Sequence, residues 1–176
     1  MAIKTILTEP NKILRQKSLP VKKVNKEIQT LMDDMLETMY AAPGIGLAAV
    51  QIGVPKKIIV LDIARGRDNE PKKPMYFINP EIVSSSKNKV TYEEGCLSVP
   101  GQFAEIARSD QCYIKYLDYN GQKKELNAQG LLATCIQHEM DHLKGILFID
   151  YLSKFKKTFI VKKLSKRKKE LDRIIV

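Results

Sequence analysis

The six residues QHEMDH, at positions 137–142, contain both histidines of the 176-residue chain. His138 and His142 are four residues apart, so on an α-helix they would lie on the same face, one turn from each other. Two imidazoles at this spacing can bind one metal ion, and Glu139 between them could exchange protons with a metal-bound water. The pattern H-E-x-x-H therefore predicts a metal-dependent hydrolytic site.

A catalytic site of this kind needs a third protein ligand and one position left open for water. No histidine remains to supply it. One candidate is a downstream carboxylate, as in zinc peptidases, from Asp150 or Glu170. The other is the thiolate of Cys96 in the sequence EGCLS, although a single cysteine is often only a buried thiol. The residues alone leave both possibilities open.

The stretch that carries the histidines is expected to form a helix from about residue 129 to 144, with Gly145 at its C-terminal end. Leu131, Cys135, His138 and His142 follow one another at spacings of four, three and four residues. Such spacing places them on one helical stripe. Both histidines should therefore face the protein interior together with apolar neighbours.

The other elements predict an α+β fold of antiparallel or mixed sheets around this central helix. Residues 25–42 have the periodicity of an amphipathic helix with methionines in its buried stripe, and residues 44–55 are expected to form a loop. Around Asn120-Gly121, a strong hairpin signal, two strands are predicted. Further strands are expected at 56–63, 75–83 with an interruption at Pro80, 88–99, and 145–152. A final helix is expected at about 153–176, capped by Ser153, with an apolar stripe at Phe155, Phe159, Ile160, Leu164 and Leu171.

Length and composition indicate one domain spanning residues 1–176, since the chain is long enough for a real core and too short for several domains. The N-terminus reaches a charged, proline-containing segment before any signal-like apolar run, and no segment has membrane-spanning length. A cytoplasmic protein without a membrane partner is expected. Three cysteines are an odd number, which argues against a disulfide framework, and Cys112 alternates with apolar residues as a packed thiol would.

The positive charge is concentrated near the C-terminus. The net charge is +10, and residues 154–169 alone contain nine Lys or Arg and no acidic residue. A basic helix of this kind could face an anionic partner, or it could be a solvated surface that aids solubility. The charge pattern does not separate these two interpretations.

Three separate segments together resemble one family, the peptide deformylases. GIGLAAVQIG at 44–53, EGCLS at 94–98 and QHEMDH at 137–142 match its three motifs, in the same order and at similar separations. The hairpin and the stretch GLLATCIQHEMDHLKGILFIDYLS extend the likeness over most of the chain. The basic C-terminal helix is similar to that of the bacterial subclass.

The resemblance implies a role for each residue of the site. Cys96, His138 and His142 would bind the metal, with water as the fourth ligand, and Glu139 would move that water's proton to the departing amine. The side-chain amide of Gln51 and the backbone N–H of Leu97 would stabilise charge on the formyl oxygen. The methionine side chain and the peptide backbone would be held by Ile45, Gly46, Tyr92, Leu131 and Cys135.

The resemblance also implies the substrate, cofactor and partner. The substrate would be the N-formylmethionyl end of a nascent polypeptide, hydrolysed to formate and a free amine. The metal would be Fe²⁺ physiologically, with Zn²⁺, Ni²⁺ or Co²⁺ able to substitute, and the basic helix would dock on ribosomal RNA phosphates. Three positions depart from the usual pattern: Val50 replaces a common proline, Phe103 an arginine found in some members, and Thr134 an apolar residue.

Two other functions are compatible with parts of the sequence. An H-E-x-x-H endopeptidase would need a carboxylate as third ligand and would cut internal peptide bonds. A non-catalytic RNA- or ribosome-binding protein would carry a structural metal, which normally has four protein ligands rather than three. Release of formate from a formylated peptide separates the deformylase from both.

Overall fold

The computed structural model describes residues 2–64 and 71–174, with the side chains of 169 and 171–174 left out. The helices of this part are α1 Lys26–Ala41, α2 Gly130–His142 and α3 Lys154–Ile174, with short 3-10 helices η1 Lys12–Arg15, η2 Ala49–Ile52 and η3 Phe148–Tyr151. The strands are β1 Gly46–Ala48, β2 Ile58–Leu61, β3 Met75–Ser85, β4 Lys89–Cys96, β5 Val99–Ser109, β6 Gln111–Leu117 and β7 Lys123–Gln129.

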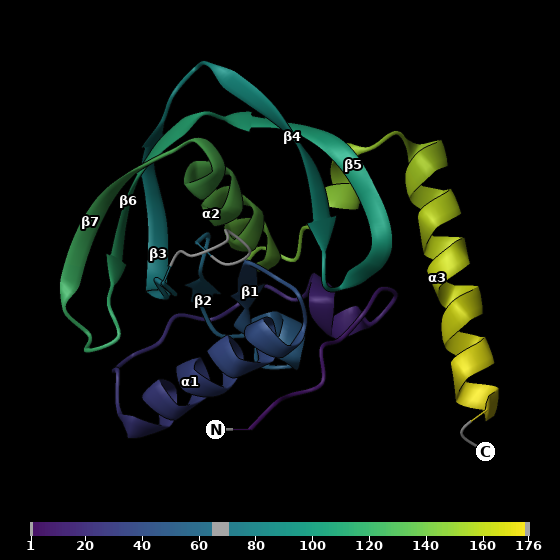
Figure 1. The fold of residues 1–176 in the computed structure, drawn as a ribbon, viewed down its shortest axis with the longest axis horizontal. Helices are drawn as coiled ribbons and strands as arrows, with labels where there is room; N and C mark the ends of the chain where they lie inside the picture. The colour runs from purple at the N-terminus through teal and green to yellow at the C-terminus, as the bar shows by residue number, and fades with distance from the viewer. Residues whose placement is uncertain (1, 65–70, 175–176) are drawn as a thin grey trace.

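The strands form two antiparallel sheets, which confirms the predicted α+β class. One sheet has the order β1-β2-β3-β6-β7, and β4 pairs with β5 in a second, two-stranded sheet. Figure 1 shows α2 enclosed between the larger sheet and the β4–β5 ribbon. Helix α1 lies below the sheet, and α3 lies at the edge of the molecule opposite β7. The helix predicted to carry the metal ligands is therefore the central element.

Strand β2 is apolar throughout because both of its faces are covered. Ile58 and Val60 pack in one core cluster with residues of α1, whereas Ile59 and Leu61 pack in another with residues of α2. All four side chains are fully buried. A continuous apolar run is what a strand covered on both faces requires, so this buried strand was correctly predicted.

Helix α1 forms where the sequence predicts it. Asn25 caps it by accepting a hydrogen bond of 3.0 Å from the Ile28 N–H. Met32, Met35 and Met39 are fully buried against the sheet, so the methionine stripe is core packing. The N-terminal segment is hydrogen-bonded to this helix. The Ala2 N–H donates to the Asp34 carboxylate, and the Lys4 N–H donates to the Thr38 hydroxyl.

Strand β3 runs through Pro80 without the predicted interruption. The pairing with β6 shifts register between Ile78 and Glu81, and Asn79 takes a positive φ of 49°. A bulge at this point accommodates the proline, which has no N–H to donate to the sheet. The Asn79 side chain bonds the backbone N–H and C=O of Val21, both at 2.8 Å, and this stabilises the unusual conformation.

Two further expectations about local structure were wrong, and one strand was not predicted. Residues 44–55 are not simply a loop, because they form β1 and η2. Residues 145–152 contain η3 instead of a strand, since the Asp150 carboxylate accepts a hydrogen bond of 2.8 Å from the Leu147 N–H and closes a tight turn. Strand β5 was missed, because Pro100 and Gly101 near its start are typical of loops; it pairs with β4 over nearly its whole length.

The C-terminal helix begins after Ser153, whose hydroxyl accepts a long hydrogen bond of 3.4 Å from Lys156 N–H. Ile160 and Leu164 are buried against β5 and η3, as the apolar stripe predicted. Phe155 and Phe159 are not part of this core, because they are 82% and 63% exposed. Leu171 lies outside the described side chains. Among the described residues, no helix is both long and apolar enough to cross a membrane.

Candidate metal centre and active site

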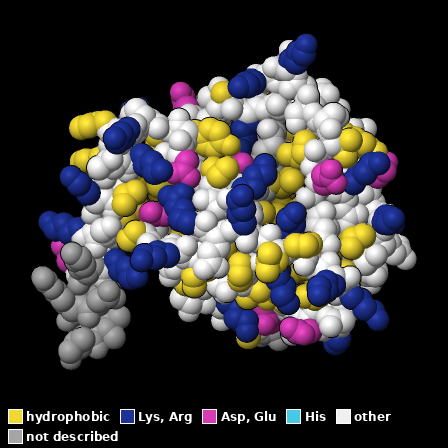
Figure 2. All heavy atoms as spheres, turned by 180° about the vertical axis from the view of Figure 1, so that it is seen from behind, with side chains coloured by type: hydrophobic (Ala, Val, Ile, Leu, Met, Phe, Trp, Pro, Cys, Tyr) yellow, Lys and Arg dark blue, Asp and Glu magenta, His cyan; other side chains and the backbone are white. Residues whose placement is uncertain are grey.

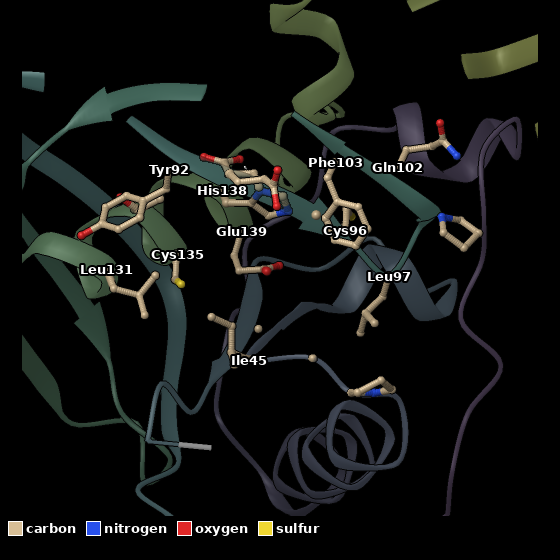
Figure 3. Close-up of a pocket in the computed structure, with 18 of the residues that line it drawn as sticks. Ile45, Tyr92, Cys96, Leu97, Gln102, Phe103, Leu131, Cys135, His138 and Glu139 are labelled. Carbon is tan, nitrogen blue, oxygen red and sulfur yellow. Dashed lines mark hydrogen bonds and ion pairs between the residues drawn. The ribbon is translucent and has the colours of Figure 1, made fainter. Parts of the chain in front are cut away.

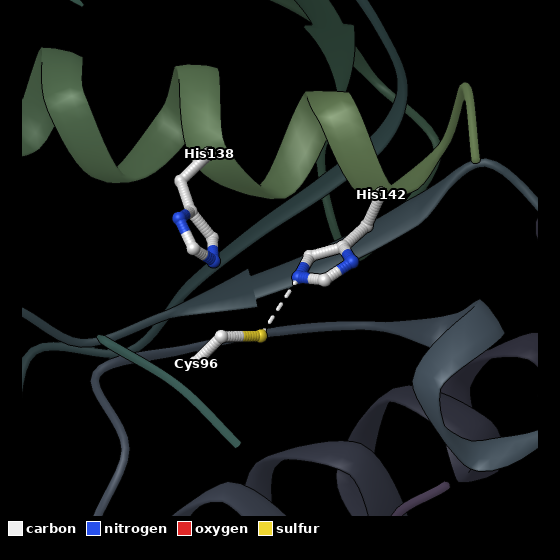
Figure 4. Close-up of side chains that lie close together, drawn as sticks. All are labelled: Cys96, His138 and His142. Atoms are coloured by element: carbon white, nitrogen blue, oxygen red, sulfur yellow. Dashed lines mark hydrogen bonds between the residues drawn. The ribbon is translucent and has the colours of Figure 1, made fainter. Parts of the chain in front are cut away.

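Cys96, His138 and His142 converge on one point beneath α2 (Figure 4). One ligand atom from each residue lies within 4.8 Å of the other two, and Cys96 Sγ is 3.3 Å from His142 Nε2. Ligands at tetrahedral zinc–sulfur and zinc–nitrogen bond lengths lie about 3.5 Å apart. The three residues therefore have the chemistry and nearly the spacing of a Cys-His-His metal site.

Two elements bring these ligands together. The histidines are one turn apart on the buried face of α2, and Cys96 is the last residue of β4. The β4–β5 pairing shifts register between Gly95 and Cys96, which then pairs with Val99 across a tight connection. This irregularity at the strand end presents the Cys96 thiol to the helix.

The carboxylate candidates for the third ligand are engaged elsewhere. Asp150 contacts Arg15 at 2.5 Å and Lys157 at 2.6 Å and caps η3. Glu170 is exposed on α3. Within the described residues, the group of potential ligands that could hold a metal consists of Cys96, His138 and His142.

A buried charge network holds His138, and the sequence analysis did not identify it. Glu94 Oε2 lies 2.8 Å from His138 Nδ1, and the same carboxylate accepts from the Arg108 guanidinium. Arg108 also donates to Asp141, which accepts a second hydrogen bond from the Tyr151 hydroxyl. With Nδ1 donating to Glu94, the Nε2 atom of His138 is left to face the metal site.

Two signals in the sequence could have found part of this network. Glu94 precedes Cys96 by two residues in a strand, so both point to the same side of it. Asp141 follows His138 by three residues on the helix, within reach of the same surroundings. Arg108 had no such signal, because β5 itself was not predicted.

The network controls the protonation of its members. Burial alone would raise the pKa of Glu94, but hydrogen bonds from His138 and Arg108 outweigh it and lower that pKa. Burial would lower the pKa of His138, yet hydrogen bonds with Cys96 and Glu94 raise it well above the ordinary value. His142 has no such carboxylate, and burial lowers its pKa well below the ordinary value. A divalent cation among these groups would favour the deprotonated form of each ligand.

Glu139 is buried beside the candidate metal ligands, and burial raises the pKa of its carboxyl group to about 7. Its Oε2 atom has no hydrogen-bond partner among the described residues. The backbone of Gly46 in β1 leaves room for this carboxylate, because a Cβ there would lie 2.5 Å from Glu139 Oε1. A carboxyl group with a pKa near neutrality and a free oxygen is suited to proton transfer.

Gln51 is also buried, on η2, and its amide is aimed at the ligands. Its Oε1 accepts the Ala48 N–H at 2.8 Å, while Nε2 donates to Ser98 Oγ at 3.0 Å and lies 3.6 Å from Cys96 Sγ. The interaction with Ala48 fixes which end of the amide faces the site. Donor hydrogens are thereby presented next to Cys96.

A cavity of about 480 Å³ opens above these groups (Figure 3). Its walls include all the predicted substrate-contacting residues and most of the predicted chemical groups: Ile45, Gly46, Gln51, Tyr92, Cys96, Leu97, Leu131, Cys135, His138 and Glu139. The third candidate ligand, His142, lies on the same helical face one turn away from His138. Cys135 lines the pocket as a protonated thiol, since burial raises its pKa to about 12.

The three departures from the family pattern lie in different surroundings. Val50 is fully buried in η2, where it packs in the core next to α2. Thr134 and Phe103 both line the cavity. Phe103 is 65% exposed at its rim.

Comparison with known proteins agrees with this geometry. The polypeptide deformylase family matches residues 3–158. A peptide deformylase of Pelagibacter ubique is 67% identical over 178 residues, covering 100% of both chains, and one of Phenylobacterium zucineum is 56% identical over 96% of this chain and 99% of its own. The crystal structure of an Ehrlichia chaffeensis peptide deformylase in complex with actinonin has a TM-score of 0.90 and 47% identity, over 95% of this chain and 98% of that one.

A peptide deformylase of Legionella pneumophila is similar over 98% of this chain and 99% of its own, with a TM-score of 0.88 and 43% identity. These likenesses span the full set of elements that carry the ligands, the cavity and the Gln51 amide. The chain belongs to the peptide deformylase family, the metal-dependent hydrolases that remove the N-formyl group from nascent polypeptides.

Proposed function

We propose that Cys96, His138 and His142 hold one divalent metal ion and that the cavity above them is the active site. The observation that carries this proposal is the convergence of three ligand atoms within 4.8 Å of one another, directly beside Glu139 and a cavity open to a peptide. A divalent cation held there would activate a water molecule and polarise the formyl group. Fe²⁺ is the metal we expect physiologically, with Zn²⁺, Ni²⁺ or Co²⁺ able to replace it, because thiolate and imidazole ligands suit all four.

Glu139 takes the proton from the attacking water and later delivers it to the departing amine. Its pKa of about 7 supports both steps, since a carboxylate in this range can accept a proton and give it back near neutral pH. Its unpartnered Oε2 provides the atom that would accept the proton. Gly46 leaves the space that the Glu139 carboxylate occupies, because it has no side chain.

The Gln51 amide and the backbone N–H of Leu97 donate hydrogen bonds to the formyl oxygen as negative charge develops on it. The fixed orientation of Gln51 supports this role, because a donor that is already aligned needs no rearrangement during the reaction. Leu97 follows Cys96 directly and lines the same cavity. Its backbone N–H is therefore adjacent to the proposed ligand Cys96, where the formyl oxygen would lie.

The methionine side chain of the substrate occupies the apolar part of the cavity. Ile45, Tyr92, Leu131 and Cys135 supply walls for it, and Gly46 lets the peptide backbone approach β1 closely. Figure 3 shows Leu131 and Cys135 together on one side of Glu139, opposite Leu97. A protonated Cys135 thiol is compatible with this pocket because it behaves as a small apolar group.

The basic helix α3 binds the ribosome through RNA phosphates, and the enzyme works in the cytoplasm where nascent chains emerge. Nine Lys or Arg in residues 154–169 support the first part, because phosphate neutralisation favours association with nucleic acid. Figure 2 shows Lys and Arg side chains along the α3 side and also across the adjoining face of the body. The surface available to an anionic partner is therefore wider than the helix.

The test of this function is release of formate from a short formyl-methionyl peptide by the wild-type protein and by Glu139→Gln. The variant should keep its metal content and its fold, and it should lose about 10²–10⁴-fold in kcat, the usual contribution of a general acid–base group. The same peptide without the formyl group, and an internal-bond substrate, should remain intact. Retention of more than about a tenth of the wild-type kcat would exclude this role of Glu139.

A further inference from the structure

A second groove lies beside the proposed active site, between β5 and the first turns of α3. It has a volume of about 490 Å³, and its walls include Phe103 and Glu105 from β5 and Phe155, Lys156 and Phe159 from α3. In Figure 1 this region lies where α3 stands next to the curved strand β5. The deformylase reaction as described above does not use it.

The groove exposes three phenylalanine rings to solvent. Phe103, Phe155 and Phe159 are 65%, 82% and 63% exposed. Phe155 and Phe159 are four residues apart on α3 and so project from the same side of the helix. The contact of α3 with the body does not need them, since Ile160 and Leu164 are the buried apolar residues among the described side chains of this helix. A contiguous exposed apolar patch of this kind marks a surface that binds another molecule.

The groove adjoins the active-site cavity at Phe103, which lines both. The ring of Phe103 rests on the backbone of β4, because a Cβ on Gly95 would lie 2.6 Å from it. Gly95 directly precedes the ligand Cys96, and Figure 3 shows Phe103 next to Cys96 at the cavity. This ring therefore lies at the boundary between the active-site cavity and the groove.

We propose that the groove binds the part of the polypeptide substrate that follows its first residues, with an apolar side chain seated among Phe103, Phe155 and Phe159. The inference rests on the proposed active site. A nascent chain necessarily continues beyond the formylmethionine, and each extended residue advances it by about 3.3–3.6 Å. The groove begins at Phe103, so a chain that leaves the cavity past this ring meets the Phe155 and Phe159 rings next, and Glu105 and Lys156 offer charged groups to its polar backbone.

The test compares kcat/KM for formyl-Met-Ala-Ser with a set of formylated octapeptides. The octapeptides carry one leucine at each position from three to eight in turn, in an alanine and serine background. We expect leucine at one or two positions to raise kcat/KM by about tenfold, which corresponds to about 1.4 kcal/mol. The double variant Phe155→Ser, Phe159→Ser should abolish this gain and leave the tripeptide value within about twofold.

A matched control is Leu19→Ser, which removes a side chain that is 66% exposed and outside the groove. The Leu19→Ser protein should still show the higher kcat/KM for the leucine-containing octapeptides. Equal kcat/KM at all leucine positions, or a gain that survives the double variant, would overturn the proposal. A concentration-dependent dimer that the double variant abolishes, without any leucine gain, would also overturn it and assign the groove to a second copy of the chain. Absence of formate from every peptide would instead refute the proposed function itself.

Discussion

At the scale of single residues, the site depends on how buried charges are balanced around His138. The Glu94 carboxylate accepts hydrogen bonds from both His138 and Arg108, and the Arg108 guanidinium also donates one to Asp141. These groups are nearly inaccessible to water, so removing one partner would leave an uncompensated charge in the interior. The network therefore fixes the orientation of His138 and also makes that orientation costly to change.

The assignment of Cys96 as third ligand predicts a selective loss of metal. Cys96→Ala should lower metal affinity and activity together, because only two protein ligands remain. Cys112→Ala is the matched control, since Cys112 is a buried thiol in the core of the large sheet and should affect stability alone. Metal content after dialysis, measured by elemental analysis, checks this. A Cys96→Ala protein that retains one metal per chain as tightly as wild type would place the third ligand elsewhere.

The close packing of Gly46 against Glu139 predicts how sensitive the proposed proton transfer is to the position of the Glu139 carboxylate. In Gly46→Ala the new Cβ would lie 2.5 Å from Glu139 Oε1 and 2.7 Å from Leu61 Cδ2. Overpacking of this kind costs about 1–3 kcal/mol, while a shift of the carboxylate by about 1 Å can cost about 100-fold in rate. We expect a folded protein with normal metal content and a kcat reduced at least about tenfold.

The control for Gly46→Ala is Gly121→Ala. Gly121 has a positive φ of 78° in the turn between β6 and β7, and a Cβ there would lie 3.1 Å from Val24. The change should cost stability without approaching Glu139. If both variants lose the same small fraction of kcat at equal loss of thermal stability, close packing against Glu139 is not what Gly46 provides.

At the scale of elements, the sequence predicted those whose signals are local. The i, i+4 spacing of His138 and His142 indicated their shared face on α2, and continuous or periodic apolar runs indicated β2 and α1. Strand β5 was missed because its pairing with β4 and the covering of Ile106 depend on distant residues, whereas Pro100 and Gly101 suggest a loop. Arg108 lies on this strand, so the charge network around His138 could not be inferred before the fold was known.

The attachment of the N-terminal segment to α1 predicts a pH-dependent stability. The Ala2 N–H, at 2.7 Å, is the main cause that lowers the pKa of Asp34; burial opposes this shift, and Lys4 adds to it. Because the folded-state pKa is depressed, the stabilisation is present above the unfolded-state pKa of about 3.9 and is lost as pH falls through the lower folded value. Asp34→Asn should therefore reduce the free energy of unfolding by about 1–2 kcal/mol at pH 7.

The difference between wild type and Asp34→Asn should shrink towards zero as the pH is lowered below about 4. Denaturant unfolding at a series of pH values measures it. Glu37→Gln, which removes a carboxylate from the same helix, is the control. A difference that stays constant with pH would mean that the charge of Asp34 does not stabilise the fold.

At the scale of the whole molecule, α3 is set apart from the catalytic body. Among its described side chains, Ile160 and Leu164 are buried against the body and Lys157 pairs with Asp150. The family match ends at residue 158, so most of the helix lies beyond it. Most of its described basic side chains, among them Lys162, Lys163, Lys166 and Arg167, are exposed along the side of the molecule shown in Figure 2. Catalysis and the proposed docking can therefore be altered separately, because none of the described charged side chains of α3 lines the proposed active-site cavity.

This separation allows a direct test of ribosome binding. Charge reversal at Lys162, Lys163, Lys166 and Arg167 changes four exposed side chains, so the fold and the deformylation of a short peptide should persist. Cosedimentation with ribosomes should weaken, and wild-type binding should fall with salt by a log–log slope of about −0.7 to −0.9 per phosphate contacted. The same reversal at Lys22, Lys23, Lys87 and Lys89, which are also exposed, gives an equal net charge and should weaken binding less. If the α3 variant sediments with ribosomes as well as wild type does at low salt, the helix is only a solvated surface and the partner must bind elsewhere.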